Sequence, residues 1–519
     1  MTLKNELTYI ISIAVLGLTL LSAGCQSTIE NRDLKSASST WYVQKQDSTA
    51  NSTSNGTRSS PFHSLVAVQK VSRPGDTIRI LPSPINMPPL DGTLLMKEGQ
   101  ILEGISEDNR KPQITNSDAD NNHGDTITLA DRTIVRNLHI VSSAGHAVVG
   151  RNVNGVTVEN NWIQGGNQKD LTSVTTGATA SLGVPKFPKG LITLIHNAQI
   201  ETTSTNYVVS NTINGITTSD GNLLRLNGAG VSVHVSGNNQ STLFVTKNRI
   251  SDLGSGFQRS GILIDTQNDA RLSLIIEDSH ISNAHNSSDG IILIAQNQSL
   301  ITGAIRRYEY SGGNTPGGVG NNGLEVVTYS GGNWLKSERT ASDWHSANTR
   351  LILENSTIRG SDGFGIAFFN LFGKPSKNTV LDFGGGELGG KGNNRFFNNG
   401  KALPRGMDIY VVHQDINLSN NWWGTNRRGE SKTELVEGEL ALKREYAFVC
   451  PGTPKQLEVL IEHTGVGAWS TFCQAFNNEI CGPDPTKSTC CDPSSDPSQC
   501  LETINDNTVV FGPALSDDP

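Results

Sequence analysis

The stretch that decides the fold is residues 247–293, KNRISDLGSGFQRSGILIDTQNDARLSLIIEDSHISNAHNSSDGIIL. It contains two short signals, each present twice. One signal is a Gly followed by apolar–x–apolar, as in Gly261-Ile262-Leu263-Ile264, and the other places Asn or Ser two or three residues before an Ile, as in Lys247-Asn248-Arg249-Ile250. Alternating apolar residues with many β-branched side chains predict short strands.

Both signals recur outside this stretch, about 30 residues apart. The Gly signal starts at Gly230, Gly261, Gly290, Gly323 and Gly365. The Asn/Ser signal ends at Ile140, Ile163, Ile213, Ile250, Ile281 and Ile358. A period of this length is the signature of a solenoid. One strand of each kind per repeat predicts coils that stack into a β-helix, so the expected fold class is an all-β solenoid.

Composition agrees with a solenoid and excludes several functions. Gly makes up 54 of 519 residues, and the net charge is −8. With few basic clusters, this charge argues against nucleic acid as a partner. The sequence has no phosphate-binding Walker loop, no dinucleotide-binding fingerprint and no HExxH zinc motif.

Residues 1–24 are expected to be a lipoprotein signal peptide. An apolar run from Ile10 to Leu21 is too short to span a membrane as a helix, and Ser22-Ala23-Gly24-Cys25 follows it. This ending resembles the lipobox of bacterial lipoproteins, which implies acylation of Cys25 and anchoring to a lipid bilayer. Gln26 then implies sorting to the outer membrane. An ordinary signal peptide cut near Ala23 is the alternative. Residues 25–40 are expected to be a polar tether.

A short helix is expected just before the first strand. Ser60 is placed to cap it and Pro61 to occupy its first turn. Phe62, Leu65 and Val66 would form its apolar face, and the strand 77–81 would follow. Such a helix would cover the open end of the first coil.

The start and the end of the solenoid resemble the pectate-lyase-like right-handed parallel β-helix superfamily. The resemblance lies in Trp41-Tyr42-Val43, Asn55-Gly56-Thr57, Ser60-Pro61-Phe62, Pro74-Gly75-Asp76-Thr77-Ile78 and Asn420-Asn421-Trp422-Trp423-Gly424. It covers about residues 41–425 and implies a β-helix domain at 41–430. The superfamily includes polysaccharide lyases, glycosidases, esterases, adhesins and inert spikes, so the resemblance does not choose a function.

Two longer intervals interrupt the simple repeat, at residues 164–206 and 302–346. In solenoids such inserts form loops on one face, which is often the binding face. Decoration without a role is the alternative.

The strand register predicts which side chains face outward. If the residue after each Gly faces inward, the next one faces out. The first outward row is then Ser232, Leu263, Ile292, Glu325 and Ala367, and the second is His234, Asp265, Ile294, Val327 and Phe369. Both rows are apolar in the middle, so an insert, the C-terminal segment or a ligand is expected to cover them.

Residues 431–519 differ in composition and are expected to form a small helical and Cys-rich segment. Six cysteines lie there: Cys450, Cys473, Cys481, Cys490, Cys491 and Cys500. An even number in an exported chain predicts a disulfide framework, and six cysteines allow 15 connectivities. Their spacing lacks a CxxC pair, so zinc is the weaker alternative, and no metal site is expected.

Catalytic chemistry is expected, if present, on the face with His234, Arg259, Asp265 and Asp289. Matching positions of adjacent coils lie about 4.8 Å apart, which makes His234 a neighbour of Asp265 and brings Arg259 near Asp289. The resemblance implies an Arg or Lys base with acidic Ca²⁺ ligands for a lyase, or paired carboxylates for a glycosidase. The alternative is that these residues are not catalytic: Asp is common in turns before Gly, and Arg–Asp ion pairs are common on protein surfaces. The Asn residues of the repeat are expected to form ladders between coils.

The sequence therefore predicts an outer-membrane lipoprotein whose β-helix binds or modifies an extracellular polysaccharide. A non-catalytic adhesin or structural surface protein is the alternative. An acidic cluster in a groove would favour an enzyme, and a face covered by the chain itself would favour the alternative.

Overall fold

The computed structural model describes residues 38–46, 54–84, 86–108, 110–165, 190–218, 220–254, 259–285, 288–312, 321–329, 347–371, 378–399, 409–412, 416–418, 420–422 and 509–510. The proposed signal peptide, Cys25, nearly all of the tether and the six C-terminal cysteines lie outside these residues. Within them, no helix is long and apolar enough to cross a membrane.

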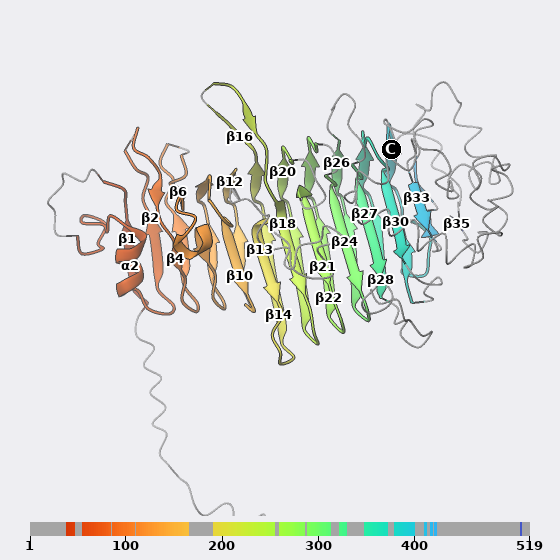
Figure 1. The fold of residues 1–519 in the computed structure, drawn as a ribbon, viewed down its shortest axis with the longest axis horizontal. Helices are drawn as coiled ribbons and strands as arrows, with labels where there is room; N and C mark the ends of the chain where they lie inside the picture. The colour runs from red at the N-terminus through yellow and green to blue at the C-terminus, as the bar shows by residue number, and fades with distance from the viewer. Residues whose placement is uncertain are drawn as a thin grey trace, which may run out of the picture. The chain divides into compact units, whose positions relative to one another are not determined.

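Most described strands belong to three parallel sheets, here named S1, S2 and S3, and from β2 to β33 the chain passes through them in that order in each coil (Figure 1). S1 contains β1 (Thr40–Val43), β2 (Thr77–Ile80), β5 (Ile101–Gly104), β8 (Ile134–Arg136), β11 (Thr157–Glu159), β14 (Thr203–Val209), β19 (Gln240–Thr246), β22 (Arg271–Glu277), β25 (Leu300–Arg306), β28 (Asn348–Glu354), β31 (Val380–Asp382), β34 (Ile416–Asn417) and β35 (Val509–Val510).

S2 holds the strands of the Asn/Ser signal and S3 those of the Gly signal. S2 contains β3 (Leu90–Asp91), β6 (Gln113–Thr115), β9 (His139–Val141), β12 (Trp162–Gln164), β15 (Thr212–Asn214), β20 (Arg249–Ser251), β23 (His280–Ser282), β26 (Glu309–Ser311), β29 (Thr357–Arg359) and β32 (Arg395–Phe397). S3 contains β4 (Leu94–Leu95), β7 (Ile127–Thr128), β10 (Val148–Arg151), β13 (Gly190–His196), β18 (Ala229–Val235), β21 (Ile262–Thr266), β24 (Ile291–Gln296), β27 (Leu324–Tyr329), β30 (Ile366–Leu371) and β33 (Ile409–Val412).

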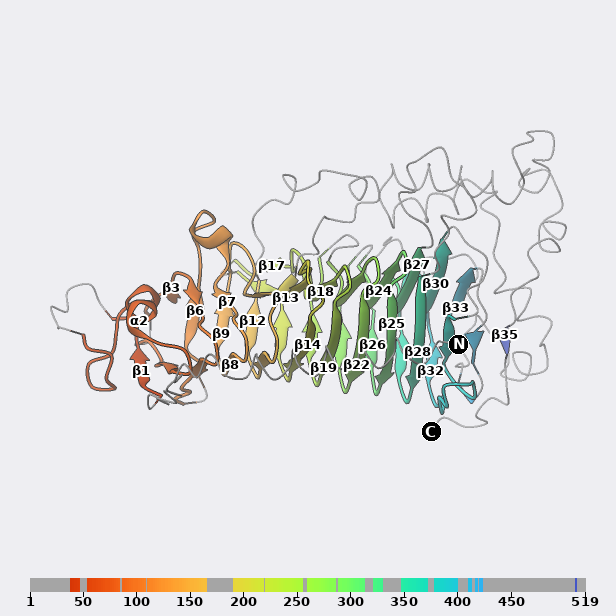
Figure 2. The same ribbon diagram turned by 90° about the horizontal axis from the view of Figure 1, so that it is seen from below.

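This topology confirms the predicted parallel β-helix. Successive coils lie side by side, and every pairing within S1, S2 and S3 is parallel, for example Val231 with Ile262 and Ile262 with Ile291 (Figure 2). A two-stranded antiparallel hairpin, β16 (Ile216–Thr217) with β17 (Leu223–Leu224), interrupts one coil between S2 and S3. A 3₁₀ turn, η1 (Asn121–Gly124), interrupts another.

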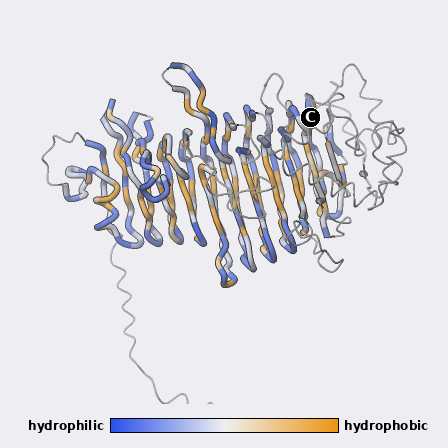
Figure 3. Tube along the Cα trace, in the orientation of Figure 1, coloured by the Kyte–Doolittle hydropathy of each residue, from blue (hydrophilic) through white to orange (hydrophobic). Residues whose placement is uncertain are grey.

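The core lies inside the coils. Apolar and polar residues alternate along many strands, as in Arg271–Glu277, where Leu272, Leu274 and Ile276 are buried (Figure 3). Each fully buried Leu or Ile contributes about 1.5–3 kcal/mol, and stacking coils makes that burial continuous.

The sharp corner between S1 and S2 depends on a residue with positive φ followed by a buried polar residue. Asn160, for example, has φ 51°, and Asn161 next to it is buried. The Asn161 backbone N–H donates to Asn211 Oδ1 (3.0 Å), and the Asn211 backbone N–H donates to Asn248 Oδ1 (3.0 Å). The predicted Asn ladders are therefore confirmed. They satisfy backbone groups that the turn would otherwise leave buried and unpaired.

The N-terminal helix begins later than predicted. Helix α2 spans Leu65–Val71, and its N-cap is Ser64, whose hydroxyl accepts from the Ala67 backbone N–H. Phe62 instead lies beside Val43 in a parallel bridge, because Ser60-Pro61 continues in extended backbone. Leu65 and Val68 are the buried residues of the helix, whereas Val66 is exposed.

The two expected inserts are shorter than predicted, because coil strands lie within both. Residues 164–206 include β13, whose Gly190 pairs with Ala229 and is therefore one residue out of phase with the other glycines. Residues 302–346 include β26, where Tyr310 takes the place of the usual Ile, and β27. The shifted glycine and the tyrosine both leave the strands with side chains that point into the interior of the coil.

Candidate functional site

His234 and Asp265 lie on neighbouring strands of S3, as the register predicted. They are Cα partners in β18 and β21, and His234 Nδ1 lies 2.9 Å from Asp265 Oδ2. Asp265 also accepts from the side-chain amides of Gln267 (2.8 Å) and Gln296 (2.7 Å). The carboxylate is thus held by three side chains in a place that excludes water, since both members of the pair are buried.

Asp289 and Arg259 lie at the other end of the same strands. Asp289 comes two residues before β24, whereas Asp265 pairs with Ile294, the fourth residue of that strand. Five residues of strand span about 16 Å. The four expected catalytic residues therefore form two groups rather than one cluster, which corrects the prediction. Register along S3 was right, but the distance along the strand separates the groups.

The outward rows of S3 are buried by the protein chain itself. Ser232, Leu263, Ile292, Glu325 and Ala367 of the first row are each at most 5% exposed. Leu263, Ile292 and Ala367 belong to a second hydrophobic cluster, separate from the interior of the coil. A cover was expected, and it exists. Asp265 and Asp289 are buried on this face as well.

Asp289 belongs to a buried acid pair with Glu325. The Asn322 backbone N–H donates to Asp289 Oδ1 (2.5 Å), and the Asn322 side-chain amide donates to Glu325 Oε2 (2.7 Å). Burial raises the pKa of Asp289 well above its usual range, and the Glu325 carboxylate adds to the rise. Burial also raises the pKa of Glu325, to about 7, against the Asn322 hydrogen bond. Two buried carboxyl groups so close together favour a state in which the pair keeps a proton, because both charged forms are disfavoured.

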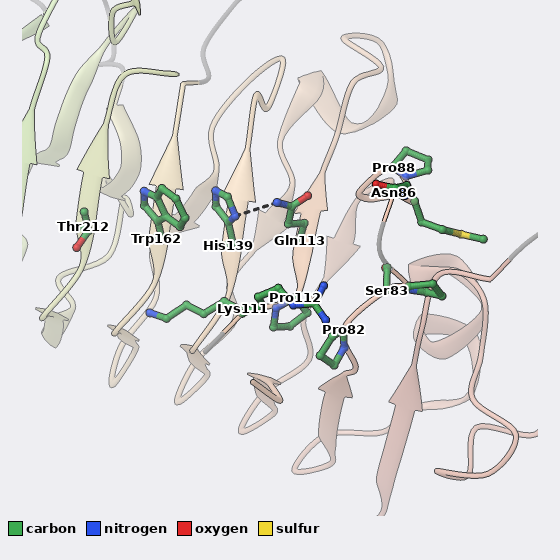
Figure 4. A pocket seen from close by; sticks show the side chains of 13 residues that line it. Pro82, Ser83, Asn86, Pro88, Lys111, Pro112, Gln113, His139, Trp162 and Thr212 are labelled. Atoms are coloured by element: carbon green, nitrogen blue, oxygen red, sulfur yellow. Dashed lines mark hydrogen bonds between the residues drawn. The ribbon is translucent and has the colours of Figure 1, made fainter. Parts of the chain in front are cut away.

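An open cavity lies elsewhere, over the outer face of S2 near the N-terminal coils. Its volume is about 510 Å³. The strands β6, β9, β12 and β15 contribute Gln113, His139, Trp162 and Thr212 to its lining, and the Pro-rich residues 82–84 and 86–88 line the end near β6 (Figure 4). Below this row lies Lys111, on the segment that leads into β6.

A stacked aromatic pair dominates this groove. The imidazole of His139 and the indole of Trp162 have ring centroids 4.0 Å apart and an interplanar angle of 5°. Trp162 is 38% exposed, which is unusual for so large a side chain. Its Nε1–H donates to Asn214 Oδ1 (2.8 Å), so the indole is fixed in place.

His139 is held beneath the indole by two amides. The Gln113 side chain lies 3.2 Å from its Nδ1 (Figure 4). The Gln164 side chain lies 2.7 Å from its Nε2. Burial lowers the pKa of His139, opposed by the Gln164 hydrogen bond. The neutral ring that results is a support for Trp162 rather than a charge in the groove.

The charges that line the groove are all positive. Arg110 and Lys111 are its ionisable side chains besides His139, and no Asp or Glu is among its lining residues. Lys111 Nζ donates to the backbone carbonyl and to the side-chain oxygen of Asn160, which positions the ammonium at the start of β12. Burial lowers the pKa of Lys111, so an anion beside it would be stabilising.

The groove therefore offers an aromatic surface, fixed amides and two cations. Such a set suits recognition of a polar, ring-containing anion. Among the described residues no group of three or more His, Cys, Asp or Glu side chains could hold a metal ion, and the proposed Ca²⁺ of a lyase has no such cluster there.

His139 and Trp162 were visible in the sequence as the third residues of Asn137-Leu138-His139-Ile140 and Asn160-Asn161-Trp162-Ile163. The same register argument that paired His234 with Asp265 places these two rings on neighbouring coils. Their partner Lys111 lies outside the repeat, so no periodic signal points to it.

No family model and no curated protein sequence matches the chain. Solved structures with a similar arrangement include a rhamnogalacturonan lyase, with 13% identity, 76% of this chain and 84% of that chain covered, and a TM-score of 0.32. Pectate lyase Pel9A has 12% identity, coverages of 61% and 78%, and a TM-score of 0.30. A GH136 lacto-N-biosidase from Eubacterium ramulus has 11% identity, coverages of 75% and 66%, and a TM-score of 0.30. These scores are too low to equate any residue of this chain with a site residue of those proteins.

Proposed function

We propose that this protein is a cell-envelope protein whose β-helix binds an anionic extracellular polysaccharide through the S2 groove. The observation that carries the proposal is the groove lining, in which an exposed indole, held by His139 and Asn214, lies near two cations with no carboxylate among the lining residues.

Each part of that lining has a physical role in sugar recognition. The faces and edges of a fixed indole contact the C–H surface of a sugar ring at little cost in conformational entropy. Lys111 and Arg110 attract carboxylate or sulfate groups and repel other cations. The side-chain amide of Gln113 supplies a donor and an acceptor of the kind that hydroxyl groups need.

The test is affinity electrophoresis of the full-length chain, solubilised in detergent. Gels would contain polygalacturonate, alginate or neutral dextran at equal mass concentrations. We expect both anionic polymers, or one of them, to retard the protein, and dextran to leave its mobility unchanged. Equal retardation by dextran would contradict the anionic preference, and no retardation by any polymer would contradict the function.

A second candidate function is catalysis on the S3 face, as a polysaccharide lyase or hydrolase. The observation that favours it is the His234–Asp265 pair, in which an imidazole and a carboxylate lie 2.9 Å apart. Both members of the pair are buried, so a substrate must first gain access to the S3 face before the pair can exchange protons with it. Arg259 and Asp289 lie about 16 Å away along the strands and would belong to a separate subsite. A depolymerisation assay on the same polymers, monitoring new reducing ends and ultraviolet absorbance, separates a hydrolase, a lyase and a non-catalytic adhesin.

The localisation is also part of the proposal. Acylation of Cys25 would anchor the chain in the outer membrane, and α2 would cover the first coil of the β-helix. We expect Cys25→Ala to move the protein from the membrane fraction to the soluble fraction. Unchanged fractionation, with no acyl mass on the mature N-terminal peptide, would contradict the anchor.

The six C-terminal cysteines would form three disulfides in an oxidising compartment, and so stabilise a segment with little core. Intact mass after alkylation, with and without reduction, counts the free thiols. Several free thiols or bound zinc would contradict the framework.

A further inference from the structure

A small residue separates two large ones in the outward row of S2. Thr212 of β15 pairs with Trp162 of β12 on one side and with Arg249 of β20 on the other. Thr212 and Arg249 are exposed, and the cavity reaches as far as Thr212. On three successive coils, the row thus presents the indole of Trp162, the small side chain of Thr212 and the guanidinium of Arg249.

The orientation of the indole determines what fits over Thr212. The ring lies parallel to His139 at about the spacing of neighbouring coils, so its plane is roughly perpendicular to the axis of the β-helix. His139 covers one face, and the other face is turned toward the coil of Thr212. The hydrogen bond to Asn214 keeps it there.

The distance between the flanking residues matches one flat ring. Trp162 and Arg249 are two coils apart, which is about 10 Å. A ring in van der Waals contact on both faces needs about 7–8 Å, because each contact takes about 3.5–4.0 Å. Among the described residues, none forms an ion pair or a side-chain hydrogen bond with the Arg249 guanidinium, so it is available to a ligand.

We propose that one acidic sugar ring of the bound glycan lies over Thr212, stacked on the free face of Trp162, with its carboxylate or sulfate on Arg249. This subsite rests on the proposed function and adds Thr212 and Arg249 to it. Because the sugar plane must be parallel to the indole, the glycan chain crosses S2 along the strand direction rather than along the helix axis.

The position of Lys111 supports this direction. Its ammonium is bonded to Asn160, the corner residue two positions before Trp162 on the same coil, at the edge of S2 where β12 begins. A glycan that crosses S2 over Thr212 brings its neighbouring sugar toward this second cation. The acidic groups of two consecutive sugars would then meet Arg249 and Lys111.

Isothermal titration of the full-length chain with a galacturonate or mannuronate tetramer tests the subsite. Thr212→Phe fills the position over Thr212 and is compatible with a strand, and Arg249→Ala removes the cation. We expect each substitution to weaken binding roughly tenfold or more. The matched controls are Thr357→Phe, four coils further along the same row, and Arg271→Ala, on the outer face of S1. Both should bind like the wild type.

The outcomes separate the subsite from the function that it rests on. If Trp162→Ala abolishes binding while Thr212→Phe keeps wild-type affinity, the groove binds the glycan and the proposed subsite is wrong. If the wild type binds neither tetramer nor the parent polymers, both proposals are wrong. Equal melting temperatures of the Phe variants would exclude misfolding as the cause of a loss.

Discussion

The imidazole of His139 lies flat against the indole of Trp162, with ring centroids 4.0 Å apart, on the outer face of a sheet whose other face is the core of the β-helix. The pair turns two positions of a structural repeat into a rigid platform. Because His139 is bonded to Gln113 and Gln164, the platform exists before any ligand arrives, and binding does not have to order it.

Trp162→Ala should weaken binding of anionic polysaccharide more than tenfold, because it removes the largest contact surface in the groove. The change should lower the melting temperature little, since the side chain is 38% exposed. Affinity electrophoresis and thermal unfolding measure the two effects. Tyr207→Ala on S1 is the control, because Tyr207 is similarly exposed at 37%. Equal losses in both variants would argue against a specific groove.

Lys111→Gln should weaken binding several-fold and flatten its dependence on NaCl. The ammonium interacts with an anionic ligand through charge, and salt screens exposed charges. Titration at two salt concentrations checks this. The control is Lys70→Gln, at the last turn of α2, which should leave both the affinity and its salt dependence unchanged. An unaltered salt dependence in the Lys111 variant would show that this cation does not meet the ligand.

Protein stability should fall as the pH rises from about 4.5 to about 7 because of Glu325 and Asp289. Burial raises the pKa of Glu325 from 4.5 to about 7, so the folded protein keeps a proton that the unfolded chain releases. That contribution is complete below the unfolded pKa and is lost as the pH rises through the folded pKa. Each pH unit between the two pKa values corresponds to about 1.4 kcal/mol of unfolding free energy.

Glu325→Gln should therefore reduce this pH dependence and raise the melting temperature at pH 8 relative to the wild type. Denaturant unfolding at pH 5 and pH 8 provides the comparison. Glu387→Gln, an exposed carboxylate paired with Arg350, is the control and should keep the wild-type slope. A Glu325→Gln variant with an unchanged slope would mean that the acid pair does not hold a proton.

Asp265→Ala should destabilise the protein by about 3 kcal/mol, because it removes the acceptor that buried His234 and half-buried Gln267 and Gln296 share. Asp252→Ala is a comparison at a partly buried turn and should cost less. If Asp265→Ala removes a polysaccharide-cleaving activity without lowering the melting temperature, the pair is catalytic rather than structural, and the second candidate function gains support.

Asn211→Ala should destabilise the β-helix by about 1–3 kcal/mol. Its side chain accepts from the Asn161 backbone N–H and donates to the Val158 carbonyl, and both groups are buried. Asn197→Ala, at an exposed loop position after β13, is the control. A similar melting temperature for both variants would mean that the ladder contributes no more than the turn itself.

The sequence by itself determined the coil, because a strand that must bury one face repeats its apolar residues and its turn residues at the period of the solenoid. From that period alone, the pairing of His234 with Asp265 and the Asn ladder follow. The helix start at Ser64 and the strands inside 164–206 escaped this argument, because Gly190 is out of phase and Ser60-Pro61 resembles a cap without forming one.

Only the tertiary structure decided which face of the coil is open. Periodicity states which side chains point outward, but burial depends on what else packs against each sheet. The two S3 rows that hold Glu325 and Asp265 are closed, whereas Trp162 on S2 stays exposed. Lys111 joins the groove through a contact with Asn160, 49 residues away in the sequence, which no local pattern encodes. The candidate site thus depends on contacts between segments far apart in the chain, while the fold depends on a pattern repeated within it.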